Sequence, residues 1–513
     1  MTTSPTANAR SATPQVDAAA KRGTLIAMIL ASGVVFLDGT AVSVALPTIG
    51  RDLNAGLSGL QWIVNGYALT LAALLILGGS LGDHYGRKRM LIVGLVGFGV
   101  ASVLCGVAPT TEVLIAARML QGVAGALLVP EGLAILSAVY TDAAERGAAI
   151  GAWTGWGGIV AVFGPFLGGL FVERGFWRGV FFLNVPLIAV VLFLVARYVP
   201  ETRDAEAPKR LDWLGAALVI VGLGGIAYGL TEGPSVGWSA PLVLAGLIGG
   251  VVALVAFVVA EARVPEPMVP LGLFRNGNFT GANLATLGMY AALAGAGFFV
   301  VIFVQNTLHY PAIAAGAALL PVSALMLLFA SRFGKLSGRY GPRRFMVAGP
   351  VLAGCSFLLF LLVRPGVGYW TSIFPAALLL GAGLCVTVAP LTSTVMGAVP
   401  AHQSGIASAI NNVASRVAGL LAVAGLGVVV ALSFVGGLEE RSGALPPEAR
   451  AVVREAGRVG SGAVPEGTPP EVARVIEAAY TDAFHRAMLA CAALAFASAA
   501  IAFVAVRDEG SRQ

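Results

Sequence analysis

Three ionisable residues that could carry chemistry stand inside long apolar stretches of this 513-residue chain: Asp38, Arg118 and Glu131. A charged side chain at membrane depth is energetically expensive, and such residues commonly mark ion pathways, proton relays or substrate sites. The carboxyl groups of Asp38 and Glu131 can bind and release a proton, and the Arg118 guanidinium can pair with a carboxylate. These residue types indicate proton transfer or the binding of a charged solute. The alternatives are a purely structural ion pair for Asp38 and Arg118, and a position facing a water-filled vestibule for Glu131.

The apolar stretches indicate an all-α integral membrane protein. Of all residues, 57% are hydrophobic and 11% are charged, whereas soluble domains carry about 25% charged residues. A helix needs about 20 apolar residues to cross a bilayer, and the 67 glycines suit closely packed membrane helices. We predict fourteen spans, at about residues 25–46, 60–82, 90–108, 113–135, 148–172, 179–197, 213–231, 240–260, 280–304, 312–332, 345–363, 370–392, 405–435 and 485–506.

The predicted spans place Asp38 and Arg118 at a similar depth. The first and fourth spans run in opposite directions, and a helix rises about 1.5 Å per residue. Asp38 then lies about 12 Å below Leu46, and Arg118 lies about 9 Å below Glu112. We therefore expect the two side chains to pair, directly or through water, which would lower the energetic cost of both charges.

Basic residues gather in alternate loops and set the predicted orientation. One set of loops contains Arg87–Arg89 and Arg343–Arg344, and Lys21 and Arg22 precede the first span. The loops on the other side carry fewer basic residues. This asymmetry predicts a multi-pass protein of the inner or plasma membrane with both termini in the cytoplasm.

An internal repeat divides the chain into parts. Residues 79–89 match residues 334–344 at an offset of 255 residues, which relates the first span to the ninth. Two six-helix halves with an inserted helix pair follow from this offset. We expect a disordered cytoplasmic N-terminus at 1–22, a six-helix bundle at 23–198, the inserted pair at 199–265, a second six-helix bundle at 266–506 and a cytoplasmic tail at 507–513.

A long outer loop is expected at 436–484 within the second bundle. Pro446-Pro447-Glu448 and Pro469-Pro470-Glu471 resemble helix starts, with proline early and an acid in the first turn. Short surface helices and a flexible spacer are both compatible with this composition. The preceding span at 405–435 is longer than a bilayer requires, so we expect its first turns at the cytoplasmic surface.

The first copy of the repeat resembles the loop between helices 2 and 3 of the major facilitator superfamily. The matching pattern is Gly-x-x-x-Asp-x-x-Gly-Arg-Lys-Arg, and the resemblance implies a conformational latch. His84 departs from the usual basic residue after the aspartate, and Gly338 replaces the aspartate in the second copy. The latch residues implied by the resemblance are Gly79, Asp83, Gly86, Arg87 and Lys88.

Other motifs resemble the fourteen-helix drug:proton antiporters of the EmrB/QacA-like kind. The segment around Asp38 is similar to their first-helix motif, and Arg118 matches the arginine of their fourth-helix motif. The resemblance implies proton coupling or substrate binding at Asp38 and proton transfer at Arg118, and Glu131 is a further proton-coupling candidate that lies outside the family pattern. The fifth span resembles the antiporter signature, which is typical of exporters, through Gly164, Pro165, Gly168 and Gly169.

Polar residues within the spans are candidates for the wall of a substrate cavity: Asn65, Tyr67, Gln121, Asn411 and Asn412. The resemblance implies a proton-coupled exporter of small amphipathic or cationic compounds, acting as a monomer by alternating access. The alternatives are an exporter of an endogenous lipid or secondary metabolite, and a proton-coupled uptake symporter. We expect no enzyme activity, cofactor, metal or nucleic-acid partner, because the sequence shows neither a metal-ligand cluster nor a phosphate-binding loop.

Overall fold

The computed structural model describes residues 17–203, 211–400, 403–443, 445–465 and 467–508. Most of the N-terminus that we expected to be disordered, and the last residues of the tail, lie outside these ranges. The helices are α1 Ala18–Asp52, α2 Leu57–Tyr85, α3 Arg87–Gly106, α4 Thr111–Val139, α5 Ala143–Glu173, α6 Gly179–Phe182, α7 Asn184–Tyr198, α8 Trp213–Val236, α9 Pro241–Glu261, η1 Leu271–Arg275, α10 Gly277–Asn306, α11 Ala312–Ala317, α12 Leu320–Tyr340, α13 Pro342–Leu359, η2 Phe360–Leu362, η3 Tyr369–Thr371, α14 Ile373–Gly397, α15 Ser404–Ser442, α16 Pro447–Val459 and α17 Pro470–Ala505.

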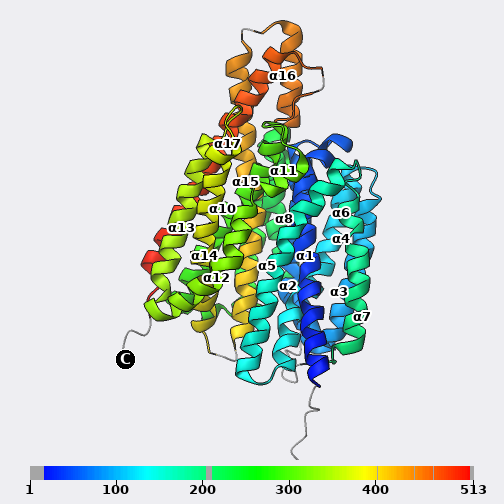
Figure 1. Ribbon diagram of the computed structural model, residues 1–513, viewed down its shortest axis with the longest axis vertical. Coiled ribbons are helices and arrows are strands. Elements are labelled where there is room, and N and C mark those ends of the chain that lie inside the picture. The colour runs from blue at the N-terminus through cyan, green and yellow to red at the C-terminus, as the bar shows by residue number, and fades with distance from the viewer. Residues whose placement is uncertain (1–16, 204–210, 401–402, 444, 466, 509–513) are drawn as a thin grey trace, which may run out of the picture.

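The fold is an all-helical membrane bundle, as predicted. Among the described residues, thirteen helices are long and apolar enough to cross a bilayer. α5 has 31 residues, of which Phe163–Glu173 form a further apolar segment, so the count agrees approximately with the predicted fourteen. Both described chain ends lie at one end of the bundle, which we call the terminal end, and α16 lies at the other, which we call the hairpin end (Figure 1).

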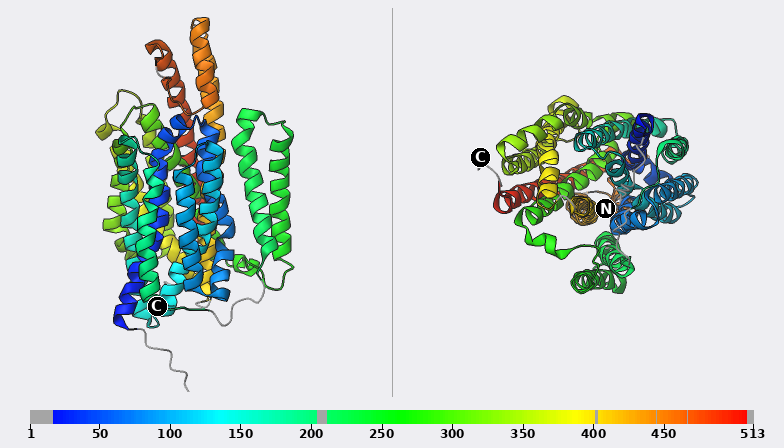
Figure 2. Two further views of the ribbon diagram at one scale, coloured as in Figure 1. Left: turned by 90° about the vertical axis from the view of Figure 1, so that its right-hand side faces the viewer. Right: turned by 90° about the horizontal axis from the view of Figure 1, so that it is seen from below.

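The helices pack in two groups. In the N-terminal group, α1–α7, the closest pairs are α2 with α4, α3 with α4, and α1 with α5. In the C-terminal group, α10–α17, they are α10 with α17, α13 with α14, and α12 with α14. α8 and α9 form a separate hairpin that stands beside both groups (Figure 2).

The α8–α9 hairpin is attached through a carboxylate at the hairpin end. Glu232 of α8 accepts hydrogen bonds from Ser58 Oγ at 2.6 Å and from Trp62 Nε1 at 2.9 Å, both on α2. The lower part of α8 also packs apolar side chains such as Leu223 against Leu69 and Leu420. The hairpin therefore contacts both helix groups through α8.

Contacts between the two groups are prominent toward the hairpin end. Gln61 of α2 donates a hydrogen bond to the Val423 carbonyl of α15 at 2.5 Å. Gln305 of α10 donates to the Val44 carbonyl of α1 at 2.9 Å. α11 also packs against α5. These contacts join the two helix groups in the part of the bundle nearest the hairpin end.

The predicted outer loop is largely helical, which corrects the boundaries drawn from the sequence. α15 continues to Ser442, α16 occupies Pro447–Val459 and α17 begins at Pro470. The two proline-glutamate pairs do start helices, because proline is favoured in the first turn and the acid faces the helix dipole. α15 extends beyond the predicted span at the hairpin end, where Leu438 packs against α16. The expectation that its first turns lie at the cytoplasmic surface stays a prediction.

The internal repeat is visible as two equivalent glycine turns. Gly86 follows α2 with φ of 111°, and Gly341 follows α12 with φ of 84°, a region that side chains other than glycine rarely adopt. Glu201 accepts a hydrogen bond from the Lys88 amide at 3.0 Å, and Asp508 accepts one from the Arg343 amide at 3.0 Å. Each turn is thus capped by a carboxylate that follows the last helix of its own group.

Close packing of α2 on α4 depends on Gly78. A methyl group at this position would overlap the backbone carbonyl of Ala126. We expect Gly78→Ala to lower the free energy of unfolding by about 1–3 kcal/mol, the usual effect of overpacking. Thermal unfolding of the purified protein checks this. Gly249→Ala is the matched control, because its new methyl group would meet nothing within 4 Å, and equal losses in both variants would contradict the account.

Candidate functional site

A buried ion pair lies between α1 and α4. Arg118 Nη1 is 2.6 Å from Asp38 Oδ2, and the side chains are 2% and 0% exposed. Arg118 Nε also donates to the Ile63 carbonyl of α2 at 3.1 Å. The two residues predicted to share a depth are therefore in direct contact, and the guanidinium ties three helices together.

The second carboxylate oxygen of Asp38 is held by two amides. Oδ1 accepts hydrogen bonds from Gln121 Nε2 and from Asn184 Nδ2, each at 2.9 Å. Ser102 Oγ accepts from the same two amides, at 2.9 and 3.2 Å. The carboxylate thus has a charged donor on Oδ2 and two neutral donors on Oδ1, so both oxygens are hydrogen-bonded.

Arg118 connects this network to a cavity. Its guanidinium carbon is 4.3 Å from the centre of the Tyr67 ring, within the range of a cation–π contact. Both residues line a cavity of about 590 Å³ between α1, α2, α5, α10 and α15. A change in the charge state of Asp38 would therefore alter the electrostatic field at the cavity wall through one intervening side chain.

The cavity has the size and chemistry of a small-molecule site. Pockets of 300–1,000 Å³ with mostly apolar walls and a few polar groups are typical of such sites. Three of the predicted cavity residues line it: Asn65, Tyr67 and Asn412. Arg416 of α15 also lines the cavity and adds a positive charge. The Asn65 amide and the Tyr67 hydroxyl have no hydrogen-bond partner within the described part of the protein.

Two predicted cavity residues lie elsewhere. Gln121 is fully buried in the Asp38 network. Asn411 points into the C-terminal group, where it donates to Asn283 Oδ1 at 3.1 Å and to Thr286 Oγ1 at 2.8 Å. Position along a helix was known from the sequence, but rotation about the helix axis decides which side chains face the cavity.

The glycines of α5 bring that helix against the residues next to Asp38. A side chain at Gly164 would meet Thr40 and the Leu37 carbonyl, and one at Gly168 would lie 2.7 Å from the Ala41 carbonyl. Gly169 faces the backbone of Ile313 in α11. Pro165 lines the cavity. These α5 positions therefore join α1, the cavity and the C-terminal group.

Glu131 stands apart from the Asp38 network. It is 0% exposed, and its two carboxyl oxygens have no hydrogen-bond partner among the described residues. A side chain at Gly82, next to Asp83 of the predicted latch, would collide with this carboxyl group. Glu131 is therefore packed against the last turn of α2.

The predicted latch loop makes its polar contacts within the N-terminal group. Asp83 at the end of α2 accepts from Arg87 Nε at 2.8 Å, and Arg87 Nη1 donates to the Ala134 carbonyl at 3.3 Å. Lys88 Nζ donates to the Ala196 carbonyl at 3.2 Å. Gly79 packs against Pro130, where an added methyl group would make ordinary van der Waals contact.

Sequence reasoning did not single out two members of the Asp38 network. Ser102 and Asn184 are both fully buried in apolar helices. Their polar type within apolar runs was a usable signal, because buried polar groups need partners. Cys105 lies next to this network, with its sulfur 3.8 Å from Gln121 Oε1.

Comparison with known proteins gives a consistent result. Residues 28–423 match the Major Facilitator Superfamily. The chain is 32% identical to the tetracenomycin C resistance and export protein of Streptomyces glaucescens, over 95% of this chain and 92% of that protein. It is 32% identical to the multidrug efflux pump LfrA of Mycolicibacterium smegmatis, over 96% and 98% of the two chains. It is 36% identical to the multidrug resistance protein Stp of Mycobacterium tuberculosis, over 80% and 75%.

A solved structure shares the fold. The inward-facing, unoccupied form of a bacterial homologue of the human lysosomal transporter Spinster superposes with a TM-score of 0.68 and 17% sequence identity. The match covers 97% of this chain and all of the other. At this identity the likeness concerns the arrangement of the helices.

Removing one partner of the buried ion pair should destabilise the protein strongly. Asp38→Asn leaves the Arg118 guanidinium buried without a counter-charge, and we expect the free energy of unfolding to fall by about 3–5 kcal/mol. The double variant Asp38→Asn with Arg118→Gln should recover part of this loss, since neither charge remains.

Arg178→Gln provides the control for this measurement. Arg178 pairs with Asp52 at 2.9 Å, but the two side chains are 31% and 48% exposed. A pair so exposed contributes only about 0–1 kcal/mol. Unfolding by heat and by denaturant compares the variants, and an Asp38→Asn protein as stable as Arg178→Gln would show that the pair is not held in the buried form described.

Proposed function

The chain belongs to the Major Facilitator Superfamily, and we propose that it is a proton-coupled antiporter that exports small amphipathic or cationic compounds. The observation that carries the proposal is the buried Asp38–Arg118 pair at the wall of a drug-sized cavity. The similar proteins named for drug resistance, efflux or export support this direction of transport. As a transporter, the chain is not an enzyme.

Asp38 is the proposed proton carrier. When ionised, it is neutralised by Arg118 and held by Gln121 and Asn184. A proton on the carboxyl group removes the ion pair and leaves Arg118 without a counter-charge. The network would then favour a different arrangement, because a protonated carboxyl donates where the ionised group only accepts.

Competition between proton and substrate follows from the position of Arg118. Its guanidinium lines the cavity. With Asp38 protonated, this guanidinium presents an uncompensated positive charge to a bound molecule, which raises the free energy of a cation in the cavity. Mutual exclusion of proton and substrate is the condition for exchange transport. Arg416 adds a second positive charge to the wall and disfavours dications.

Glu131 and the latch loop are proposed to act in the conformational step. Glu131 lies beneath the Gly82–Asp83 turn, and Asp83 pairs with Arg87. A change in the protonation of Glu131 would change its fit against this turn. We propose that Gly79, Asp83, Gly86, Arg87 and Lys88 restrain the movement of α2 and α3 during transport.

The orientation and the moving parts belong to the same proposal. We propose that the terminal end faces the cytoplasm and the hairpin end faces outward across the cell membrane. α1–α7 and α10–α17 would rock as two bundles around the cavity. The bundles would pivot at α5, where helices pack closely at Gly164, Pro165, Gly168 and Gly169. α8 and α9 would be an inserted pair, as in fourteen-helix antiporters, and the chain would act as a monomer.

Export of an endogenous product is the second candidate function. One similar protein is named both for resistance to tetracenomycin C and for its export, and another is a probable actinorhodin transporter from Streptomyces coelicolor. The coupling residues proposed for this chain serve either kind of cargo. Two measurements on a strain that lacks the gene separate the two candidates. Retention of an endogenous compound inside the cells would favour export of that product, and a lower tolerance of added drugs would favour drug export.

Transport driven by an imposed pH gradient tests the proposed function. We expect everted membrane vesicles with an acidic interior to accumulate ethidium or Hoechst 33342 when they contain the wild-type protein. Asp38→Asn should abolish accumulation driven by the gradient, because its side chain cannot exchange a proton. Its affinity for the cationic dye should also fall, because Arg118 is left without a counter-charge, so the two proteins are compared at dye concentrations that saturate each of them. The variant Arg178→Gln changes a partly exposed ion pair outside the cavity and should transport normally. Undiminished gradient-driven accumulation by Asp38→Asn would rule out the coupling role.

A further inference from the structure

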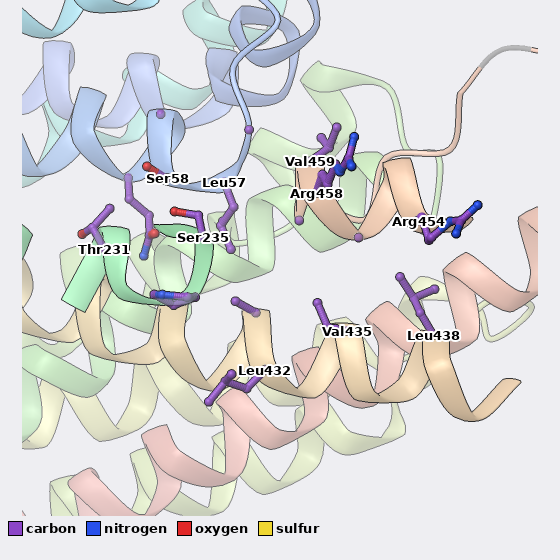
Figure 3. A pocket seen from close by; sticks show the side chains of 18 of the residues that line it. Leu57, Ser58, Thr231, Ser235, Leu432, Val435, Leu438, Arg454, Arg458 and Val459 are labelled. Atoms are coloured by element: carbon purple, nitrogen blue, oxygen red, sulfur yellow. The ribbon is translucent and has the colours of Figure 1, made fainter. Parts of the chain in front are cut away.

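A second large space lies at the hairpin end, outside the central cavity. This groove has a volume of about 790 Å³ and is formed by α2, α8, α15 and α16. Figure 3 shows Leu432, Val435 and Leu438 of α15 along one side, with Thr231 and Ser235 of α8 near one end. Arg454 and Arg458 of α16 also line it. Glu439 of α15 lines it as well, so the groove combines an apolar wall with a polar rim that carries charges of both signs.

The groove and the central cavity share the same faces of two helices. On α15, the residues lining the cavity end at Val423, and those lining the groove begin at Gly427. On α2, Gln61 lines the groove and Val64 lines the cavity. A separation of three or four residues is one helical turn, or about 5–6 Å. The groove and the cavity thus lie about one helical turn apart, along the same face of α2 and along the same face of α15.

Between the residues that line the two spaces, α2 and α15 are in direct contact. Gln61 Nε2 donates to the Val423 carbonyl at 2.5 Å. The Gln61 side chain lies directly against Gly427, where an added methyl group would overlap it. Separation of these two helices, which belong to different bundles, would open the cavity into the groove.

The chemistry of the groove suits the same kind of molecule as the cavity. Both volumes fall in the range that holds a drug-sized ligand. Leu432 is 57% exposed and Val435 is 40% exposed, so an apolar ring or chain could lie against α15. Glu439, which also lines the groove, could meet a cationic end, and the Ser58 and Ser235 hydroxyls, which donate to Glu232, could accept a hydrogen bond.

We propose that this groove is a release site for the exported compound, an amphipathic molecule that passes the Gln61–Val423 contact on its way out. The inference rests on the proposed function and extends it. It assigns a role to the inserted helix α8 and to α16, which form the side and rim of the groove. The compound would leave between α8 and α15 after α2 and α15 separate.

Bulky side chains in the groove test this inference. Leu432→Trp and Val435→Trp fill the groove without touching the central cavity. Because a blocked release step limits turnover, we expect gradient-driven uptake of the dye that the wild type transports faster, ethidium or Hoechst 33342, to fall roughly tenfold. Dye binding to the purified protein should stay at the wild-type affinity. Leu242→Trp is the control, since Leu242 is 70% exposed on α9 and does not line the groove.

A reversible modification keeps the test independent of folding. Val435→Cys is a small change, and a thiol-specific methanethiosulfonate reagent adds bulk only after the protein has folded. Transport should fall after modification and return after reduction with dithiothreitol, while Leu242→Cys should respond to neither treatment.

The outcomes distinguish a failure of the release site from a failure of the proposed function. Groove variants that transport like Leu242→Trp, or that lose dye binding as well as transport, would overturn the release site and leave the proposed function standing. A wild-type protein that accumulates neither dye under a pH gradient would overturn the proposed function and the release site together.

Discussion

The contact between Asp38 and Arg118 is the constraint on which the rest of the structure depends. Two opposite charges at 2.6 Å with almost no exposure are tolerated in an apolar bundle only when their remaining hydrogen-bonding groups are satisfied. Gln121, Asn184 and the Ile63 carbonyl meet that need. As a result α1, α2, α4 and α7 have to meet at one depth.

Small residues make that meeting possible. α5 approaches α1 beside the ion pair at Gly164 and Gly168, and α2 approaches α4 at Gly78. Any side chain there would push a helix away from the charged network. The glycines that resemble an antiporter signature thus have a direct physical role, which is to keep the helix that lines the cavity in contact with the helix that carries Asp38.

Much of this arrangement could be predicted from the sequence, because apolar length and charge placement are properties of the chain itself. The spans, the repeat and the shared depth of Asp38 and Arg118 follow from helix rise and hydropathy. The rotation of each helix does not, so Gln121 was expected in the cavity wall and lies in the network, and Asn411 faces its own bundle. The predicted spans on either side of α16 are shorter than α15 and α17. The turns that these two helices add near α16 are amphipathic and have the composition of a loop, so hydropathy does not reveal them.

The structure arranges two ligand-sized spaces along one face of α2 and one face of α15, with a proton-binding candidate beside the first. Protons and cargo would then be linked through Arg118 and not through direct contact. This accounts for coupling without requiring a specific cargo, since an uncompensated guanidinium acts on any cation nearby. It also places the movement needed for transport at the crossing of Gln61 and Val423.

Proton release on substrate binding tests the central claim most directly. Purified protein in weakly buffered solution with a pH-indicator dye would receive ethidium or Hoechst 33342, whichever the wild type transports faster, over a series of pH values. The account predicts that substrate binding releases protons from the wild type and releases none from Asp38→Asn when enough dye is added to saturate that weaker-binding variant. Equal proton release from the two proteins would contradict it.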